Sequence, residues 1–212
     1  MHARVEAGTA LNARPDEAVT GLEVHARSVV LGGKSFGAAG AYEKIAGTIR
    51  FAADSTHPLN QRVTDIGLAP KNSSGRVEFS GDFYLLKPVD MSKGNGRLLL
   101  DVANRGRKVA LGMFNSTPRA PDPSTPEDFG NGFLMRHGYT VAWVGWQTDV
   151  PRRDGLMALD VPRARGVTGF IRCELRPNER VEKLPLADRY HIPNPVSDLA
   201  DPEAREIGRA HV

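Results

Sequence analysis

Two stretches of the chain, residues 44–51 and 77–85, alternate apolar and polar residues with a period of two. Such alternation is typical of strands that bury one face and expose the other, so both are predicted to be half-buried strands. The second run ends at Pro88, and residues 22–31 are a weaker strand candidate ahead of both. The apolar positions are Ile45, Gly47, Ile49 and Phe51 in the first run, and Val77, Phe79, Gly81, Phe83 and Leu85 in the second.

The pattern changes after residue 96, where two nearly unbroken apolar runs appear, RLLLDVA at Arg97–Ala103 and YTVAWVGW at Tyr139–Trp146. Runs of this kind suit strands that are covered on both faces, as in a parallel sheet. Between them, Lys108–Phe114 and Phe129–Arg136 have helical character and flank a proline-rich loop. Strand, helical segments and strand predict a parallel βαβ unit.

The rest of the chain is less regular. Residues 1–20 carry small and charged residues without periodicity, and we interpret them as a flexible tail. After Pro151 the chain is rich in Arg and Pro, and one alternating strand, Val167–Leu175, is predicted to belong to an antiparallel insertion. We therefore expect one incomplete α/β domain over residues 21–205, divided into a β-rich part (21–90), the parallel βαβ unit (91–150) and the insertion (151–205).

Composition and charge exclude several classes of function. Hydrophobic residues make up 40% of the chain and charged residues 25%, which is ordinary for a soluble globular protein. The formal net charge is only +3 and the Arg residues are scattered, so nucleic acid is not an expected partner. The single Cys173 and the absence of metal-ligand spacings argue against a metal site, and no cofactor is expected.

Membrane association and secretion are not expected either. No run approaches the roughly 18 apolar residues of a membrane span, and residues 1–17 lack the apolar core of a secretory signal. The chain as written is therefore expected to stay in the cytoplasm. A start codon chosen inside a longer gene would give the same appearance, which leaves the localisation open.

The chain contains no GxSxG sequence. Serine hydrolases built on an α/β sheet need this motif because only small residues fit the tight strand-to-helix turn that exposes the nucleophile. No serine follows either apolar run at such a turn. The sequence therefore predicts that no catalytic nucleophile, acid or base of this kind is present in these residues.

Asn104, Arg105 and Gly106 directly follow the apolar run LLLDVA. The carboxyl ends of strands line the ligand crevice of an open α/β sheet, and backbone N–H groups presented there can stabilise an oxyanion. These three residues are the oxyanion-hole candidates, with a plain helix start, capped by Asn104, as the alternative. Trp146 and Gln147 end the second run and are candidates for lining a crevice; the alternative is that Trp143 and Trp146 are both core residues.

Five stretches, in order along the chain, resemble the bacterial "alpha/beta hydrolase domain" family of uncharacterised proteins. They cover most of residues 35–204. The stretches are SFGAAGAYEKIAGTIRF (Ser35–Phe51), APKNSSGRVEFSGDFYLLKP (Ala69–Pro88), LLLDVANRGRKVALGMFN (Leu98–Asn115), GFLMRHGYTVAWVGWQTDV (Gly132–Val150) and NPVSDLADPEA (Asn194–Ala204).

The resemblance implies an α/β-hydrolase sheet in which VANRG forms the strand-to-helix corner with the oxyanion loop and YTVAWVGWQ forms the next parallel strand. Family members continue with further strands, a nucleophile elbow of the GxSxSG type, and a later acid and His. Only the corner at Asn104–Gly106 carries over to this sequence. The expected fold is thus the N-terminal part of an α/β-hydrolase sheet, preceded by antiparallel strands and truncated before the nucleophile elbow.

The last seven residues, EIGRAHV at 206–212, suggest a reason for the truncation. They are what GAG ATC GGA AGA GCA CAC GTC encodes, a run present in a common sequencing-library adapter. We hypothesise that this tail is derived from the adapter, because the resemblance to the family fades just before it. Sequencing the source DNA past Ala204 tests this idea, and a genomic codon run for EIGRAHV contradicts it.

The sequence leaves two alternative functions open. In the first, the parent protein is a serine hydrolase that cleaves an ester or related acyl bond of a small molecule, and this chain is an inactive fragment. In the second, the chain is a non-catalytic β-rich binding module that uses the exposed faces of residues 44–51 and 77–86. An unpaired sheet edge and an uncovered apolar face at the second parallel strand are expected to make the fragment aggregate. The substrate and the oligomeric state are not predicted by the sequence.

Overall fold

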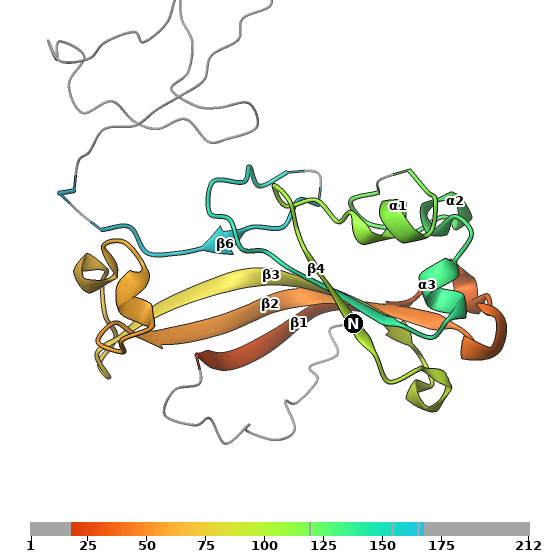
Figure 1. Ribbon diagram of the computed structural model, residues 1–212, viewed down its shortest axis with the longest axis horizontal. Coiled ribbons are helices and arrows are strands. Elements are labelled where there is room, and N and C mark those ends of the chain that lie inside the picture. The colour runs from red at the N-terminus through yellow and green to blue at the C-terminus, as the bar shows by residue number, and fades with distance from the viewer. Residues whose placement is uncertain (1–17, 119, 154, 165, 168–212) are drawn as a thin grey trace, which may run out of the picture. The chain divides into compact units, whose positions relative to one another are not determined.

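The computed structural model describes residues 18–118, 120–153, 155–164 and 166–167. The chain divides into two compact units, Met1–Arg165 and Gly166–Val212. The described part of the first unit contains all the helices and strands labelled in Figure 1. Most of the predicted tail (residues 1–17), the predicted strand beyond Val167, the remainder of the insertion and the predicted adapter-derived residues lie outside the described residues. The last part of the tail prediction, up to residue 20, is wrong because a strand begins at Val19.

The described part of the chain forms a mixed, open sheet of six strands and is mostly β, with few helices. Three long antiparallel strands come first, and the strand order across the sheet is β1-β2-β3-β5-β4, with β6 paired to β3. The strands are β1 (Val19–Val29), β2 (Tyr42–Asp54), β3 (Arg76–Pro88), β4 (Leu98–Val102), β5 (Thr140–Val144) and β6 (Leu159–Asp160).

The prediction of a parallel strand pair is confirmed. β4 and β5 pair in parallel, from Leu98 opposite Thr140 to Val102 opposite Val144. Three short helices lie between them in the chain, α1 (Ala110–Phe114), α2 (Pro126–Phe129) and α3 (Phe133–Arg136). The predicted helical stretch at 129–136 is divided in two because Gly130 and Gly132 both adopt positive φ, which interrupts a helix.

The core lies on the face of the sheet that carries these helices (Figure 1). Tyr42, Leu86, Val141 and Trp143 on this face are fully buried against α1, α2 and α3. The side chain of Asn115, itself fully buried, joins the three helices: its amide donates to the carbonyl of Phe129 at 3.0 Å, and its oxygen accepts from the N–H of Leu134 at 3.0 Å. A buried amide that is hydrogen-bonded on both sides fixes the helices relative to one another.

The other face of the sheet is apolar and exposed at β4. Leu98, Leu100 and Val102 keep 63%, 55% and 61% of their surface accessible. The prediction that both parallel strands are covered on both faces is therefore wrong for β4. The end of the strand order is also β4, because β5 lies between β3 and β4. The uncovered apolar face was expected at the second parallel strand, but it lies mainly on the first one, β4.

The antiparallel strands are confirmed, but the expected face is the more buried one over only part of β3. Near the start of the strand the expectation holds, since Val77 is 5% exposed and Glu78 on the opposite face is exposed. Toward its end the faces are reversed: Tyr84 and Leu86 are 5% and 0% exposed, whereas Phe83 and Leu85 are only partly buried. Among the described residues, helices pack against the face of Tyr84 and Leu86, and this covering decides which side is buried there.

One carboxylate, that of Glu43 on β2, is buried between two cationic side chains of the neighbouring strands. Arg27 of β1 donates to it at 2.6 and 2.9 Å, and Lys87 of β3 lies 2.6 Å away. The side chain of Glu43 is 5% exposed. The hydrogen bond from Arg27 is the main cause that lowers the pKa of Glu43, so the carboxylate stays charged and paired.

Candidate functional site

A tight turn at Asn104–Arg107 connects the end of β4 to the segment that enters α1. The carbonyl of Asn104 accepts a hydrogen bond from the N–H of Arg107 at 3.2 Å, and φ is 52° at Arg105 and 76° at Gly106. Two successive positive φ angles are typical of a type I′ turn. A left-handed conformation costs a residue with a side chain about 1–2 kcal/mol, so other contacts must hold Arg105 there.

Those contacts come from the segment that follows β5. The N–H of Arg105 donates to Oε1 of Gln147 at 2.8 Å. Its guanidinium donates to Oδ1 of Asp149 at 2.6 Å and to the carbonyl of Asp149 at 3.0 Å, and this side chain is only 18% exposed. The structure thus brings together two of the predicted site residues, Arg105 and Gln147. The backbone N–H of Arg105 is therefore already hydrogen-bonded, to the side chain of Gln147.

Gly106 is buried at the point where the turn meets a third segment. Its carbonyl accepts from the N–H of Met157 at 2.9 Å. A Cβ atom at this position would lie 2.6 Å from the carbonyl oxygen of Met157 and 2.8 Å from a methyl group of Val150. Both the positive φ and the close approach of the backbone therefore require glycine here.

Asp101 of β4 anchors the start of α1, just after the turn, and the sequence analysis did not single it out. One of its carboxylate oxygens accepts from the N–H groups of Val109 at 2.9 Å and Ala110 at 2.8 Å, at the beginning of α1. The same oxygen accepts from the indole N–H of Trp143. A carboxylate inside an otherwise apolar strand is the sequence signal that could have identified it, since buried charges need such partners.

The two tryptophans have different environments. Trp143 is fully buried and its ring makes an edge contact with Tyr84, with centroids 5.7 Å apart. Trp146 is 53% exposed, and its indole N–H donates to the carbonyl of Ala103, next to Asn104. The alternative of two core tryptophans is thus wrong. Trp146 lies beside the turn, while its role in lining a crevice stays a prediction.

A groove of about 360 Å³ lies over β1, β2 and β3 on the face that carries the helices. Its sides are formed by the loop that precedes α2 and by the segment around Met157, whose N–H donates to the carbonyl of Gly106. Its polar lining residues are His25, Lys44, Asp82, Tyr84, Lys108 and Asp122, and its apolar ones include Ala26, Ala46, Pro121, Leu156 and Met157. The sequence analysis missed this group because its members are distant in the chain.

Lys108 is the most enclosed cation of this groove, with only 6% of its surface exposed. Its ammonium donates to the carbonyl of Pro121 and to that of Gly155 at 3.3 Å, and it lies 4.4 Å from the centre of the Tyr84 ring. Burial lowers the pKa of Lys108 to about 8, although the carboxylates of Asp122 and Asp82 act in the opposite direction. A cation–π contact and carbonyl oxygens stabilise the charged form.

The remaining charges of the groove are paired. Asp122 accepts from Lys44 at 2.9 Å and from the hydroxyl of Tyr84 at 2.8 Å. Burial raises the pKa of Tyr84 far above its ordinary value, and the hydrogen bond to Asp122 adds to this effect. Asp82 accepts from Arg152 at 2.7 Å. The groove therefore offers one amine with a lowered pKa, Lys108, beside two carboxylates that are already paired.

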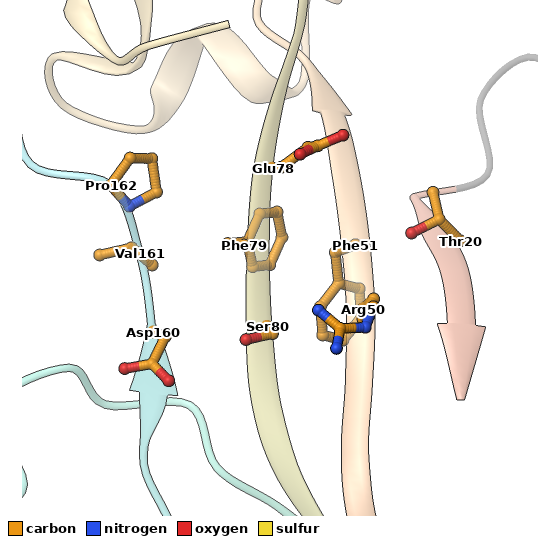
Figure 2. Close-up of a pocket in the computed structure, with 9 residues that line it drawn as sticks. All are labelled: Thr20, Arg50, Phe51, Glu78, Phe79, Ser80, Asp160, Val161 and Pro162. Carbon is orange, nitrogen blue, oxygen red and sulfur yellow. The ribbon is translucent and has the colours of Figure 1, made fainter. Parts of the chain in front are cut away.

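A second groove, of about 380 Å³, lies where β6 approaches the sheet (Figure 2). Phe51 and Phe79 stack on neighbouring strands with centroids 4.7 Å apart, and Figure 2 shows Asp160 across from Ser80. The other lining residues are Thr20, Arg50, Glu78, Val161 and Pro162. This lining holds a serine and carboxylates but no histidine, so it does not contain the Ser–His pair of a serine hydrolase.

Comparison of the chain with models of protein families, with curated proteins and with solved structures gave no match. In the part of the chain that the structure describes, no helix has the length and apolar character needed to cross a membrane. Within the same residues, no three side chains of His, Cys, Asp or Glu lie together in a way that could hold a metal ion.

Proposed function

We propose that this chain is the N-terminal part of a serine α/β-hydrolase that cleaves an ester or related acyl bond of a small molecule. The observation that carries the proposal is the turn at Arg105–Gly106, which has two positive φ angles and lies at the carboxyl end of a parallel strand just before a helix. Ligands of open α/β sheets bind at this edge. The resemblance of the sequence around Asn104–Gly106 to the oxyanion corner of the "alpha/beta hydrolase domain" family supports the same assignment.

The corner is held rigidly enough for such a role. Asp101 anchors the start of α1 just after it, Asp149 holds the Arg105 side chain, and Met157 holds Gly106. An oxyanion hole works because its donors are fixed before charge develops on the substrate, and one donor is worth about 2.7–4 kcal/mol. In our proposal Gln147 keeps the Arg105 amide hydrogen-bonded without substrate, and an oxyanion takes the place of its side-chain oxygen during the reaction.

The nucleophile, acid and base of this mechanism would be supplied by residues that follow in a longer parent protein, because the 212 residues contain no GxSxG. The serine would attack the acyl carbon, a histidine would take its proton, and the corner would hold the resulting oxyanion. The chain by itself is expected to be inactive.

The test compares the chain with a longer one read from the source gene. We expect a GxSxG within the next roughly 100 residues, from the usual size of a domain. The longer chain is expected to hydrolyse p-nitrophenyl esters and to bind a fluorophosphonate probe covalently at that serine, and the 212-residue chain to do neither. Absence of the motif from the gene, or a longer chain that neither reacts with the probe nor cleaves esters, contradicts the proposal.

A non-catalytic binding module is the alternative, and the exposed surface of β1 is the observation that favours it. All residues of β1 except Gly21 are exposed, although Leu22 and Val24 are apolar. A β-rich module could use such a strand to pair with a partner. The parallel β4–β5 pair and its helical connection argue against a simple β module. Binding activity without any hydrolase activity in the longer chain would favour this alternative.

A further inference from the structure

The groove around Lys108 places an enclosed primary amine against a cavity that a small molecule could enter. The amine nitrogen is fixed by the carbonyls of Pro121 and Gly155 and by the Tyr84 ring. Lys108 lines a groove of about 360 Å³ although only 6% of its surface is exposed. Most lysines of a folded protein hold their amines in bulk water. An amine in this position is unusual and is not used by the proposed hydrolase mechanism.

We propose that Lys108 is a carbonyl-reactive amine that forms an imine with a small uncharged aldehyde bound in this groove. The geometry supports this class of ligand. Two ammonium groups, Lys44 and Lys108, and two carboxylates, Asp82 and Asp122, balance the charge of the lining, so a charged ligand gains little. Leu156 and Met157 offer an apolar wall, and the volume is large enough for a small organic molecule.

The reaction balances as follows. The lone pair of the neutral Lys108 nitrogen attacks the carbonyl carbon, a C–N bond forms, and the carbonyl electron pair moves to the oxygen. The nitrogen loses one proton and the oxygen gains one, which gives a carbinolamine. The oxygen then takes a second proton and leaves as water while the nitrogen lone pair forms the C=N bond, and the nitrogen gives up its remaining proton to solvent, which leaves a neutral imine at Lys108. No oxidant or reductant takes part, and the step is reversible.

Burial of Lys108 lowers the pKa of its amine and so increases the neutral fraction at ordinary pH. With the pKa at about 8, roughly a fifth of the Lys108 amines are neutral at pH 7.4, against about a thousandth for a lysine with an ordinary pKa. Lys44 on β2 lowers this pKa further, while Asp82 on β3 and Asp122 in the loop before α2 raise it. Tyr84, also on β3, stays protonated, and His25 on β1 completes the titratable lining.

The experiment is reductive labelling of the full chain. The folded protein is incubated with glycolaldehyde and sodium cyanoborohydride at pH 7.4, and peptide mass mapping gives the labelling rate of each lysine. Lys108 is expected to react about ten times faster than the exposed Lys71, because the larger neutral fraction outweighs the lower nucleophilicity of a weaker base. In denaturing urea the preference is expected to disappear. Equal rates for the two lysines in the folded chain, or a slower rate at Lys108, overturn the proposal.

Two variants separate a reactive groove amine from a lysine that is merely exposed by loop motion. Asp122→Asn removes a carboxylate that raises the pKa of Lys108, so its labelling should increase at pH 7 and level off at lower pH. Lys44→Met should act in the opposite direction, with Lys71 unchanged in both. Near-ultraviolet circular dichroism checks that each variant is folded. Shifts in the same direction in both variants, or none in either, overturn the assignment, and neither result bears on the hydrolase proposal.

Discussion

The two faces of the sheet differ in how much of their apolar surface is buried. On one face, Trp143, Val141 and Leu86 are completely buried under short helices. On the other, Leu100 and Val102 of β4 keep more than half of their surface exposed. Both faces are apolar. What differs is that residues 110–136 return over only one of them, so the connection between the parallel strands determines where the core forms.

The covered face determines the stability of the fold, and the exposed face determines the solubility of the chain. Burial of an apolar side chain contributes roughly 25 cal/mol per Å² removed from water, so the covered face stabilises the fold and the exposed face contributes little. An exposed apolar edge strand instead favours association with other chains. Substitutions on the covered face should therefore change stability, and substitutions on the exposed face should change association.

Trp143→Ala should lower the free energy of unfolding by about 3–5 kcal/mol. The substitution leaves a large cavity in the covered face and removes the indole donor of Asp101. Leu100→Ala, on the exposed face of neighbouring β4, is the matched control and should cost less than about 1 kcal/mol. Urea denaturation followed by circular dichroism measures both. Equal losses for the two variants would mean that both faces are covered in solution.

Gly106→Ala should cost more than about 2 kcal/mol, because it adds a clash with the Met157 carbonyl to the strain of a positive φ. Gly96→Ala is the control: Gly96 also has a positive φ, of 70°, but its Cβ would meet nothing within 4 Å. The control should lose only about 1 kcal/mol. Thermal melting compares the variants, and similar losses would show that the turn is less tightly enclosed than described.

The free energy of unfolding should rise between pH 8 and 9.5 by about 1.6 kcal/mol through Lys108 alone. Across this range the folded chain goes from half to almost complete loss of the Lys108 proton, because the pKa is lowered to about 8, while the unfolded chain mostly keeps it. Raising the pH therefore stabilises the folded state until the ordinary lysine pKa is reached. Lys108→Met should lack this rise. The comparison stops below pH 10, since the raised pKa of Tyr84 reverses the trend above it.

Replacing Leu98, Leu100 and Val102 with threonine should change the free energy of unfolding by only about 0.5 kcal/mol per site, since these side chains are already exposed. The aggregation that we expect of this chain should fall, because the substitutions remove the apolar surface of the edge strand. Light scattering against protein concentration measures the effect. A wild-type chain that stays monomeric and melts cooperatively would contradict the expected aggregation.

The sequence predicted the strands well because alternation and apolar runs depend on neighbouring residues. The runs 44–51, 77–85, 97–103 and 139–146 all coincide with strands. It predicted the covered face poorly, since that depends on where residues 110–136 lie in space. For the site, the Asn104–Gly106 turn was found from its place after a strand. Lys108, Asp122 and Tyr84 were missed because their proximity arises only from side-chain contacts between β3 and segments distant in the chain.

The buried Glu43 has a consequence for how the three long strands find their alignment. Its carboxylate contacts Arg27 on one neighbouring strand and Lys87 on the other. Side chains alternate between faces, so a slip of one residue in either pairing would turn Glu43 away from one of these cations. A buried carboxylate that loses a partner is costly, by about 3–5 kcal/mol. A single acidic side chain thus selects one register out of the several that the apolar pattern of β1, β2 and β3 would tolerate.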